Sequence, residues 1–78
     1  MRIHTTEITP AQIDACLARM KASPFKAAVI AFAAMDAGIL DYRLAQQLAD
    51  RLIQKQRQLG NIHVTQPYPT WLWVGKKP

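Results

Sequence analysis

Residues 30–49 read IAFAAMDAGILDYRLAQQLA, and this stretch decides the fold. An apolar, alanine-rich segment gives way to an amphipathic one across a single glycine, Gly38. Glycine adopts the positive φ that commonly ends a helix, and Asp41 is a suitable N-cap for a helix that follows it. The stretch therefore predicts two helices joined by a short turn.

Start and stop signals extend this prediction to three helices. The sequence Thr-Pro-Ala-Gln at 9–12 is a capping-box start and predicts a first helix over about 10–21. Ser-Pro at 23–24 gives the second helix a similar start, over about 24–37, and its apolar character on nearly every side suits a central helix. The third helix is expected over about 41–59. Its core-facing side is expected to hold Leu44, Leu48, Leu52 and Leu59.

After Gly60 the apolar period changes from that of a helix to that of a strand. Residues 62–66 alternate apolar and polar side chains, residues 70–74 are strongly β-prone, and Pro67-Tyr68-Pro69 separates them. This pattern predicts a β-hairpin over about 62–75. Because two strands alone are only marginally stable, the β-prone residues 2–5 are a candidate third strand for the same sheet.

Length and composition indicate one small globular domain, residues 1–78. The single cysteine, Cys16, excludes an internal disulfide and a cysteine-based zinc site, and its place beside the apolar face of the first helix suits a buried, inert thiol. The longest apolar run, 27–35, is far shorter than the about 20 residues that cross a bilayer. We therefore expect a soluble, cytoplasmic protein with no membrane span.

The net charge of +5 is concentrated in the second half of the chain. Residues 1–39 carry four basic and three acidic side chains, whereas residues 40–78 carry six basic and two acidic ones. A basic C-terminal half points to a polyanionic partner, most often nucleic acid. Many small basic domains bind no polyanion, so this alternative stays open.

The order helix, helix, turn, helix, hairpin resembles the winged helix-turn-helix family. The resemblance is sharpest at the turn, where Ala34, Gly38 and Leu44 stand at the small, glycine and aliphatic positions of that motif. It implies a mainly α fold with a small β-hairpin, namely a three-helix winged helix-turn-helix domain. Residues 22–23 are too short for the strand that the family usually has between its first two helices, so none is expected. The alternative fold is a plain three-helix bundle with a C-terminal hairpin.

The resemblance also implies a function, which is sequence-specific binding of double-stranded DNA by a small transcriptional regulator of bacterial or phage type. The third helix would enter the major groove and the hairpin would act as the wing. Arginine can pair with guanine, glutamine can pair with adenine, and basic side chains can neutralise phosphates. The expected DNA-binding residues are Tyr42, Arg43, Gln46, Gln47, Arg51, Gln54, Lys55, Arg57, His63, Lys76 and Lys77.

Two further predictions concern protein partners. A winged helix can instead be a protein-interaction module, such as an adaptor or a phage-type inhibitor of a host protein, and the pair Trp71 and Trp73 beside Tyr68 favours this alternative. A homodimer is expected to form through the N-terminal segment and first helix or through the tryptophan face. The alternative is a monomer that uses its extra apolar residues in its own core. Those residues are Ile3, Ile8, Ile53, Tyr68, Trp71 and Trp73.

The sequence offers no support for catalysis. His4 and His63 are the only histidines, and neither has a partner at a spacing typical of a metal or catalytic site. A glycine-rich phosphate-binding loop is also missing from the sequence. We therefore expect no enzymatic activity, no metal, no cofactor and no small-molecule ligand.

Overall fold

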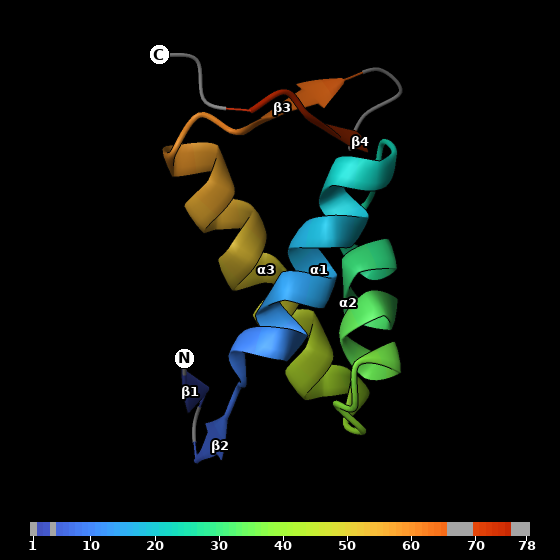
Figure 1. Ribbon diagram of the computed structural model, residues 1–78, viewed down its shortest axis with the longest axis vertical. Coiled ribbons are helices and arrows are strands. Elements are labelled where there is room, and N and C mark those ends of the chain that lie inside the picture. Colours follow the sequence, from blue (N-terminus) through green and yellow to red (C-terminus); the bar gives the residue numbers. More distant parts are fainter. Residues whose placement is uncertain (1, 4, 66–69, 76–78) are drawn as a thin grey trace.

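The computed structural model describes residues 2–3, 5–65 and 70–75. Within these residues the chain forms three helices and four short strands, so the expected mainly helical fold with a small β-hairpin is confirmed. The helices pack side by side, with one hairpin across one end of the bundle and the N-terminal hairpin near the other (Figure 1). The elements are β1 (Arg2–Ile3), β2 (Thr6–Glu7), α1 (Pro10–Ala22), α2 (Ala27–Asp36), α3 (Tyr42–Gln58), β3 (Ile62–Thr65) and β4 (Thr70–Trp73).

The capping box predicted for α1 is present. The Thr9 hydroxyl accepts from the backbone N–H of Gln12 at 3.2 Å, and the Gln12 side-chain oxygen accepts from the Thr9 N–H at 3.0 Å. At the other end of the helix, Arg19 donates to the Ser23 hydroxyl at 2.8 Å. Ser23 therefore closes α1, and the prediction that it caps the second helix is wrong.

Helix α2 begins three residues later than predicted, because the segment before it is extended. Phe25 and Trp71 exchange two backbone hydrogen bonds of 2.9 and 2.7 Å, which form a single antiparallel bridge. Pro24 therefore does not open the helix. As expected, no strand lies between the first two helices in the described residues; the contact with β4 is an isolated bridge made by Phe25. Its ring is 1% exposed, so the bridge also brings a large apolar side chain into the core.

The turn between α2 and α3 has the form that the glycine predicted. Gly38, with a φ of 113°, donates to the carbonyl of Met35 at 3.0 Å, and Ile39 donates to that of Ala34 at 3.2 Å. This pair of bonds is a Schellman motif, which satisfies the last carbonyls of the helix. Ala34, Ile39 and Leu48 are all buried, so the small residue and the aliphatic ones hold α2 and α3 together as predicted.

The end of α3 departs from the leucine pattern. Leu59 was expected on the core-facing side, but it lies beyond the helix and is 44% exposed. Gln56 is buried instead, and its side-chain oxygen accepts from the Asn61 amide at 2.7 Å. The Asn61 carbonyl in turn accepts from the N–H groups of Val74 and Gly75 at 2.8 and 3.1 Å. This polar contact fastens the last turn of α3 to the hairpin.

The C-terminal hairpin packs one of its faces on the helices. Val64 pairs with Trp71 and Ile62 with Trp73, so these four side chains share the inner face. Both tryptophans are half-buried against the core. The predicted tryptophan surface is therefore largely taken up by packing within the chain.

The N-terminal residues form a separate two-stranded sheet. Arg2 pairs with Glu7 and Ile3 with Thr6, so residues 2–5 do not supply a third strand to the C-terminal hairpin. Ile3 and Ile8 are buried, as is Ile53 on α3. These three isoleucines were expected to be available for a dimer surface, but they complete the core of the single chain.

None of the helices in the described part of the chain is both long enough and apolar enough to span a membrane.

Candidate nucleic-acid interface

Helix α3 presents one continuous polar face to solvent. Its strong amphipathicity follows from the sequence, because buried residues recur at intervals of three and four along one side. Of the side chains that the sequence assigned to DNA on this helix, only Gln47 is half-buried, and the rest are exposed. The exposed ones are Tyr42, Arg43, Gln46, Arg51, Gln54, Lys55 and Arg57.

Two shallow hollows flank the first half of α3. On one side, Arg43 and Gln47 line a hollow of about 230 Å³ together with Thr6 of the N-terminal hairpin. On the other side, Gln46 and Asp50 line one of about 170 Å³ beside the start of α2. The structure therefore divides the expected base-reading residues between the two flanks of the helix.

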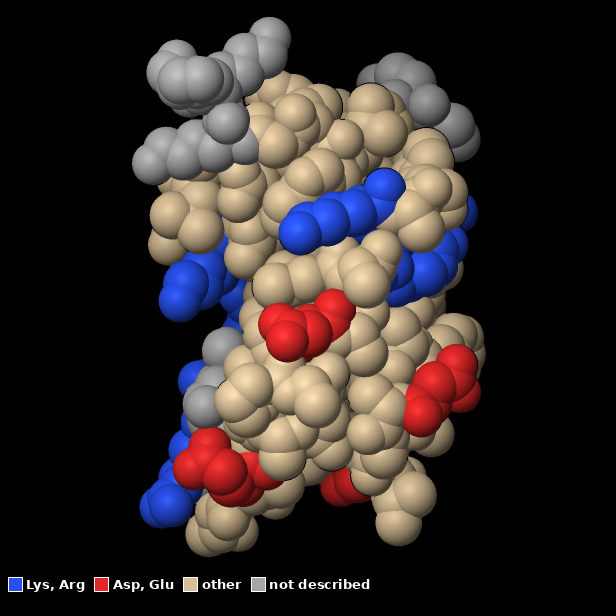
Figure 2. Space-filling model, viewed as in Figure 1, with Lys and Arg blue, Asp and Glu red and all other residues tan. Residues whose placement is uncertain are grey.

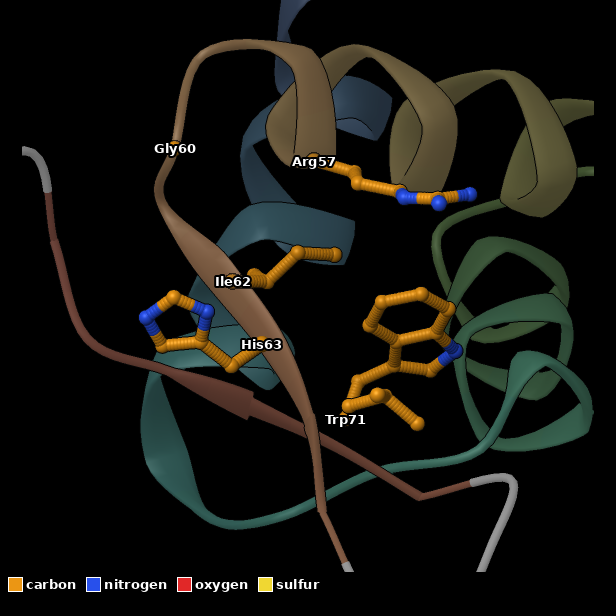
Figure 3. Close-up of a pocket in the computed structure, with 6 residues that line it drawn as sticks. Arg57, Gly60, Ile62, His63 and Trp71 are labelled. Carbon is orange, nitrogen blue, oxygen red and sulfur yellow. The ribbon is translucent and has the colours of Figure 1, made fainter.

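A third hollow, of about 350 Å³, lies between the end of α3 and the hairpin. Arg57, Ile62 and Trp71 project toward this space (Figure 3), and His63 also lines it, although its ring points to the other side of β3. Arg57 and His63 are thus near one another along the chain but do not converge on one point. Lys76 and Lys77, together with the hairpin turn at 66–69, lie outside the described residues.

The basic side chains differ in whether the protein itself engages them. On α1, Arg19 bonds to Ser23, and the Lys21 ammonium lies 5.1 Å from the centre of the Trp73 ring. Both side chains therefore support the fold. By contrast, the basic side chains on α3 have no such partner among the described residues and remain available to a ligand. These side chains are Arg43, Arg51, Lys55 and Arg57.

The helices gather most of the described basic side chains toward one end of the molecule. Helices α1 and α3 run toward the C-terminal hairpin, and α2 runs away from it (Figure 1). We call the end with the C-terminal hairpin the hairpin end, and the end with the α2–α3 turn the turn end. The hairpin end gathers the basic residues Arg19, Lys21, Lys26, Lys55 and Arg57, while Arg51 follows Asp50 midway along α3. The acidic residues Glu7, Asp36 and Asp41 lie at the turn end, together with Arg2 and Arg43.

Figure 2 shows the face that carries α1, on which acidic and basic side chains are mixed. This face is therefore a poorer match for a polyanion than the outward side of α3, where Asp50 is the only acidic residue between Tyr42 and Gln58.

Lys26 belongs to the basic end, but the sequence alone did not single it out. It is exposed and precedes α2 by one residue. Its charge was counted with the nearly neutral first half of the chain. Only the antiparallel course of α2 brings it to the end where α3 finishes, so no signal in the sequence by itself marks it as part of this surface.

Cys16 and the carboxylates do not gather into a metal site in the described residues. No group of three histidine, cysteine, aspartate or glutamate side chains there could hold a metal ion. Burial raises the pKa of the Cys16 thiol to about 11, and its Sγ lies 3.9 Å from the Ile30 carbonyl oxygen. A thiol with so high a pKa is a poor nucleophile at neutral pH.

The chain matches no protein-family model, and comparison with curated proteins and with solved structures gave no match.

Proposed function

We propose that the chain binds duplex DNA in a sequence-specific manner, as a winged helix-turn-helix protein acting as a small transcriptional regulator. The observation that carries this proposal is the outward face of α3, where arginine, lysine and glutamine side chains without intramolecular partners cover the helix from end to end. Arginine and glutamine are the side chains best suited to base edges, and lysine and arginine bind phosphates.

The arrangement of the elements supports the winged-helix assignment. A recognition helix needs a tight turn before it and a wing after it, and Gly38 and the C-terminal hairpin supply these. The bridge between Phe25 and Trp71 joins the segment before α2 to the wing, which is the place of the strand that such domains have between their first two helices. The turn, the hairpin and the bridge thus agree with one fold.

The length of α3 suggests that its two halves contact different parts of the DNA. At 1.5 Å per residue, its 17 residues span about 25 Å, about twice the 12 Å width of the major groove. The first half can therefore lie in the groove, with Arg43, Gln46 and Gln47 at base edges. The second half then extends toward the backbone, where Arg51 and Lys55 neutralise phosphates.

The test is selection of duplexes from a random pool by the full chain, with the preferred and random sequences then compared at two salt concentrations. We expect the preferred duplex to bind more tightly at both. Arg43→Ala should reduce the preference at one or two base pairs. Lys55→Ala should weaken binding to every duplex alike and reduce the salt slope by about one.

The matched control is Lys21→Ala, which removes the same charge from an exposed position on α1 instead of α3. It should leave the base preference unchanged. Equal affinity of the unaltered chain for random and selected duplexes contradicts sequence-specific regulation.

A further inference from the structure

The turn end carries an exposed apolar patch, of which only Tyr42 is among the expected DNA-binding residues. Leu40 is 90% exposed, Phe32 56% and Tyr42 40%, and the rings of Phe32 and Tyr42 lie 5.8 Å apart. Asp36 and Asp41 flank these residues in the sequence, and both are exposed. We call these five residues the tip. Large apolar side chains gathered in this way, with charges beside them, are typical of an interaction surface.

The charges of α2 support a role in interaction, because they do not serve the helix itself. Lys26 occupies the N-cap position without forming a capping hydrogen bond, and Asp36 is the last helical residue. A helix prefers anionic groups at its N-terminus and cationic groups at its C-terminus, so both charges oppose the helix dipole. The stability of α2 therefore explains neither charge.

The hairpin end carries a surface of complementary character. Its hollow of about 350 Å³ is lined by the apolar side chains of Ile62, Val64 and Trp71, with the guanidinium of Arg57 at one side (Figure 3). Val64 is 48% exposed at its rim. Among the described residues, Arg57 has no acidic partner. The hollow thus offers an apolar floor and an unpaired positive charge.

We infer that the tip of one copy docks into this hollow of a second copy, in a head-to-tail contact. Leu40 then packs on Trp71 and Val64 of the neighbouring copy, and Asp41 faces its Arg57. One oxygen of Asp41 already accepts from the Arg43 N–H at 2.9 Å, which orients the carboxylate and leaves its other oxygen free for the guanidinium. A heterologous contact of this kind uses two different surfaces of each copy.

Such a contact leaves one tip and one hollow unoccupied at the ends of every oligomer, so the copies add into open chains unless the rotation between them closes a ring. Tyr42 and Arg57 belong both to these surfaces and to the expected DNA-binding residues, whereas other outward side chains of α3, such as Gln54 and Arg51, lie outside both surfaces. The inference therefore goes beyond the proposed DNA binding, and it can be tested without DNA.

The experiment is sedimentation of the full chain over a range of concentrations at low and at high salt. We expect the average mass to rise with concentration at low salt, and to rise less at high salt because screening weakens the pairing of Asp41 with Arg57. Leu40→Asp on the tip and Arg57→Glu in the hollow should each leave a monomer at all concentrations.

Mixing these two variants is the decisive measurement. Each variant retains one intact surface, so an equimolar mixture should form dimers and nothing larger. Matched controls are Leu72→Asp on the outer face of the hairpin and Arg51→Glu on the outward side of α3, which should associate as the unaltered chain does. Circular dichroism should show the same helical content in all variants.

Three results would overturn the inference. The first is an unaltered chain that remains monomeric throughout the concentration range. The second is a mixture of the tip and hollow variants that stays monomeric, since a symmetric contact would behave in that way. The third is loss of association in the two control variants to the same extent as in Leu40→Asp and Arg57→Glu.

Discussion

At the scale of single residues, Cys16 gives the molecule a defined dependence on pH. Its pKa is raised by burial from 9.0 to about 11, so between these values the folded chain retains a thiol proton that the unfolded chain has lost. The stabilising effect of the neutral thiol is complete below about pH 9 and is lost as the pH rises through about 11. At 1.36 kcal/mol per pH unit, the free energy of unfolding should fall by about 3 kcal/mol over this range.

Urea unfolding at a series of pH values measures this effect. Cys16→Ala serves as the control, because the two proteins share every other ionisable group and only the difference between them belongs to the thiol. The alanine variant should be less stable at neutral pH, owing to the cavity it leaves, but its stability should decline less steeply above pH 9. Parallel declines in the two proteins would show that Cys16 ionises as readily in the folded chain as in the unfolded one.

Single side chains were predictable where a local pattern determines them. Thr9 and Gln12 form their capping box because both partners lie within one turn, and Gly38 takes a positive φ because the turn leaves no alternative. Gln56 and Leu59 were not predictable from the leucine spacing. Gln56 is buried because its side chain forms a hydrogen bond with the side chain of Asn61. Leu59 lies beyond the last turn of the helix, where the helical period no longer determines which side a residue faces.

At the scale of elements, Phe25 joins the helices to the hairpin. Its side chain is buried, and its backbone N–H and carbonyl both form hydrogen bonds with the backbone of Trp71. Because Phe25→Ala removes the buried ring, it should lower the free energy of unfolding by about 3–5 kcal/mol. Phe32→Ala is the matched control, since the same ring is removed from an exposed position on α2, and the expected loss is below about 1 kcal/mol. Chemical unfolding followed by tryptophan fluorescence measures both losses.

The emission maximum provides a second readout of the same prediction. Loss of the Phe25 ring should loosen β4 and expose Trp71 and Trp73, so the folded Phe25→Ala variant should emit at longer wavelength than the unaltered chain. Similar losses of stability in the two phenylalanine variants would mean that the buried Phe25 ring does not anchor the hairpin.

The ends of the helices could be predicted from the sequence wherever a capping residue or a glycine nearby in the chain determines them. The exception is the segment from Ser23 to Lys26, where Ser-Pro gave the signal of a helix start. An extended conformation is adopted there because Phe25 gains two hydrogen bonds and a buried ring from the distant Trp71. Residues 2–5 failed as a third strand for the opposite reason, since β1 pairs locally with β2, Arg2 with Glu7 and Ile3 with Thr6.

At the scale of the whole molecule, the charge distribution is a property of the arrangement. The sequence gives a basic second half, but the structure gives a basic end, to which α1 and the residue before α2 contribute as well. The candidate residues on α3 were predictable from amphipathic spacing alone. Lys26 and the tip were not, because their positions depend on the antiparallel packing of α2 between its neighbours.

This arrangement leads to a last prediction, in which stability and association change in opposite directions. Asp36→Lys places a cation at the C-terminus of α2, where the helix dipole favours it, and should stabilise the chain by about 0.3–1 kcal/mol. Lys26→Asp supplies an N-cap acceptor as well as a favourable charge, and should add about 1 kcal/mol. Asp50→Lys makes the same change of charge in the middle of α3, where the dipole has little effect, and should leave the stability nearly unchanged.

Thermal unfolding measures the stabilities, and sedimentation measures the association of the same proteins. If the charges of α2 are retained for the contact between copies, Asp36→Lys should be more stable than the unaltered chain and yet associate more weakly, because it reverses a charge on the tip. A variant that is both more stable and equally able to associate would leave Asp36 without a role in that contact. A variant that is less stable would mean that the carboxylate of Asp36 supports the fold in a way that outweighs its unfavourable position in the helix dipole.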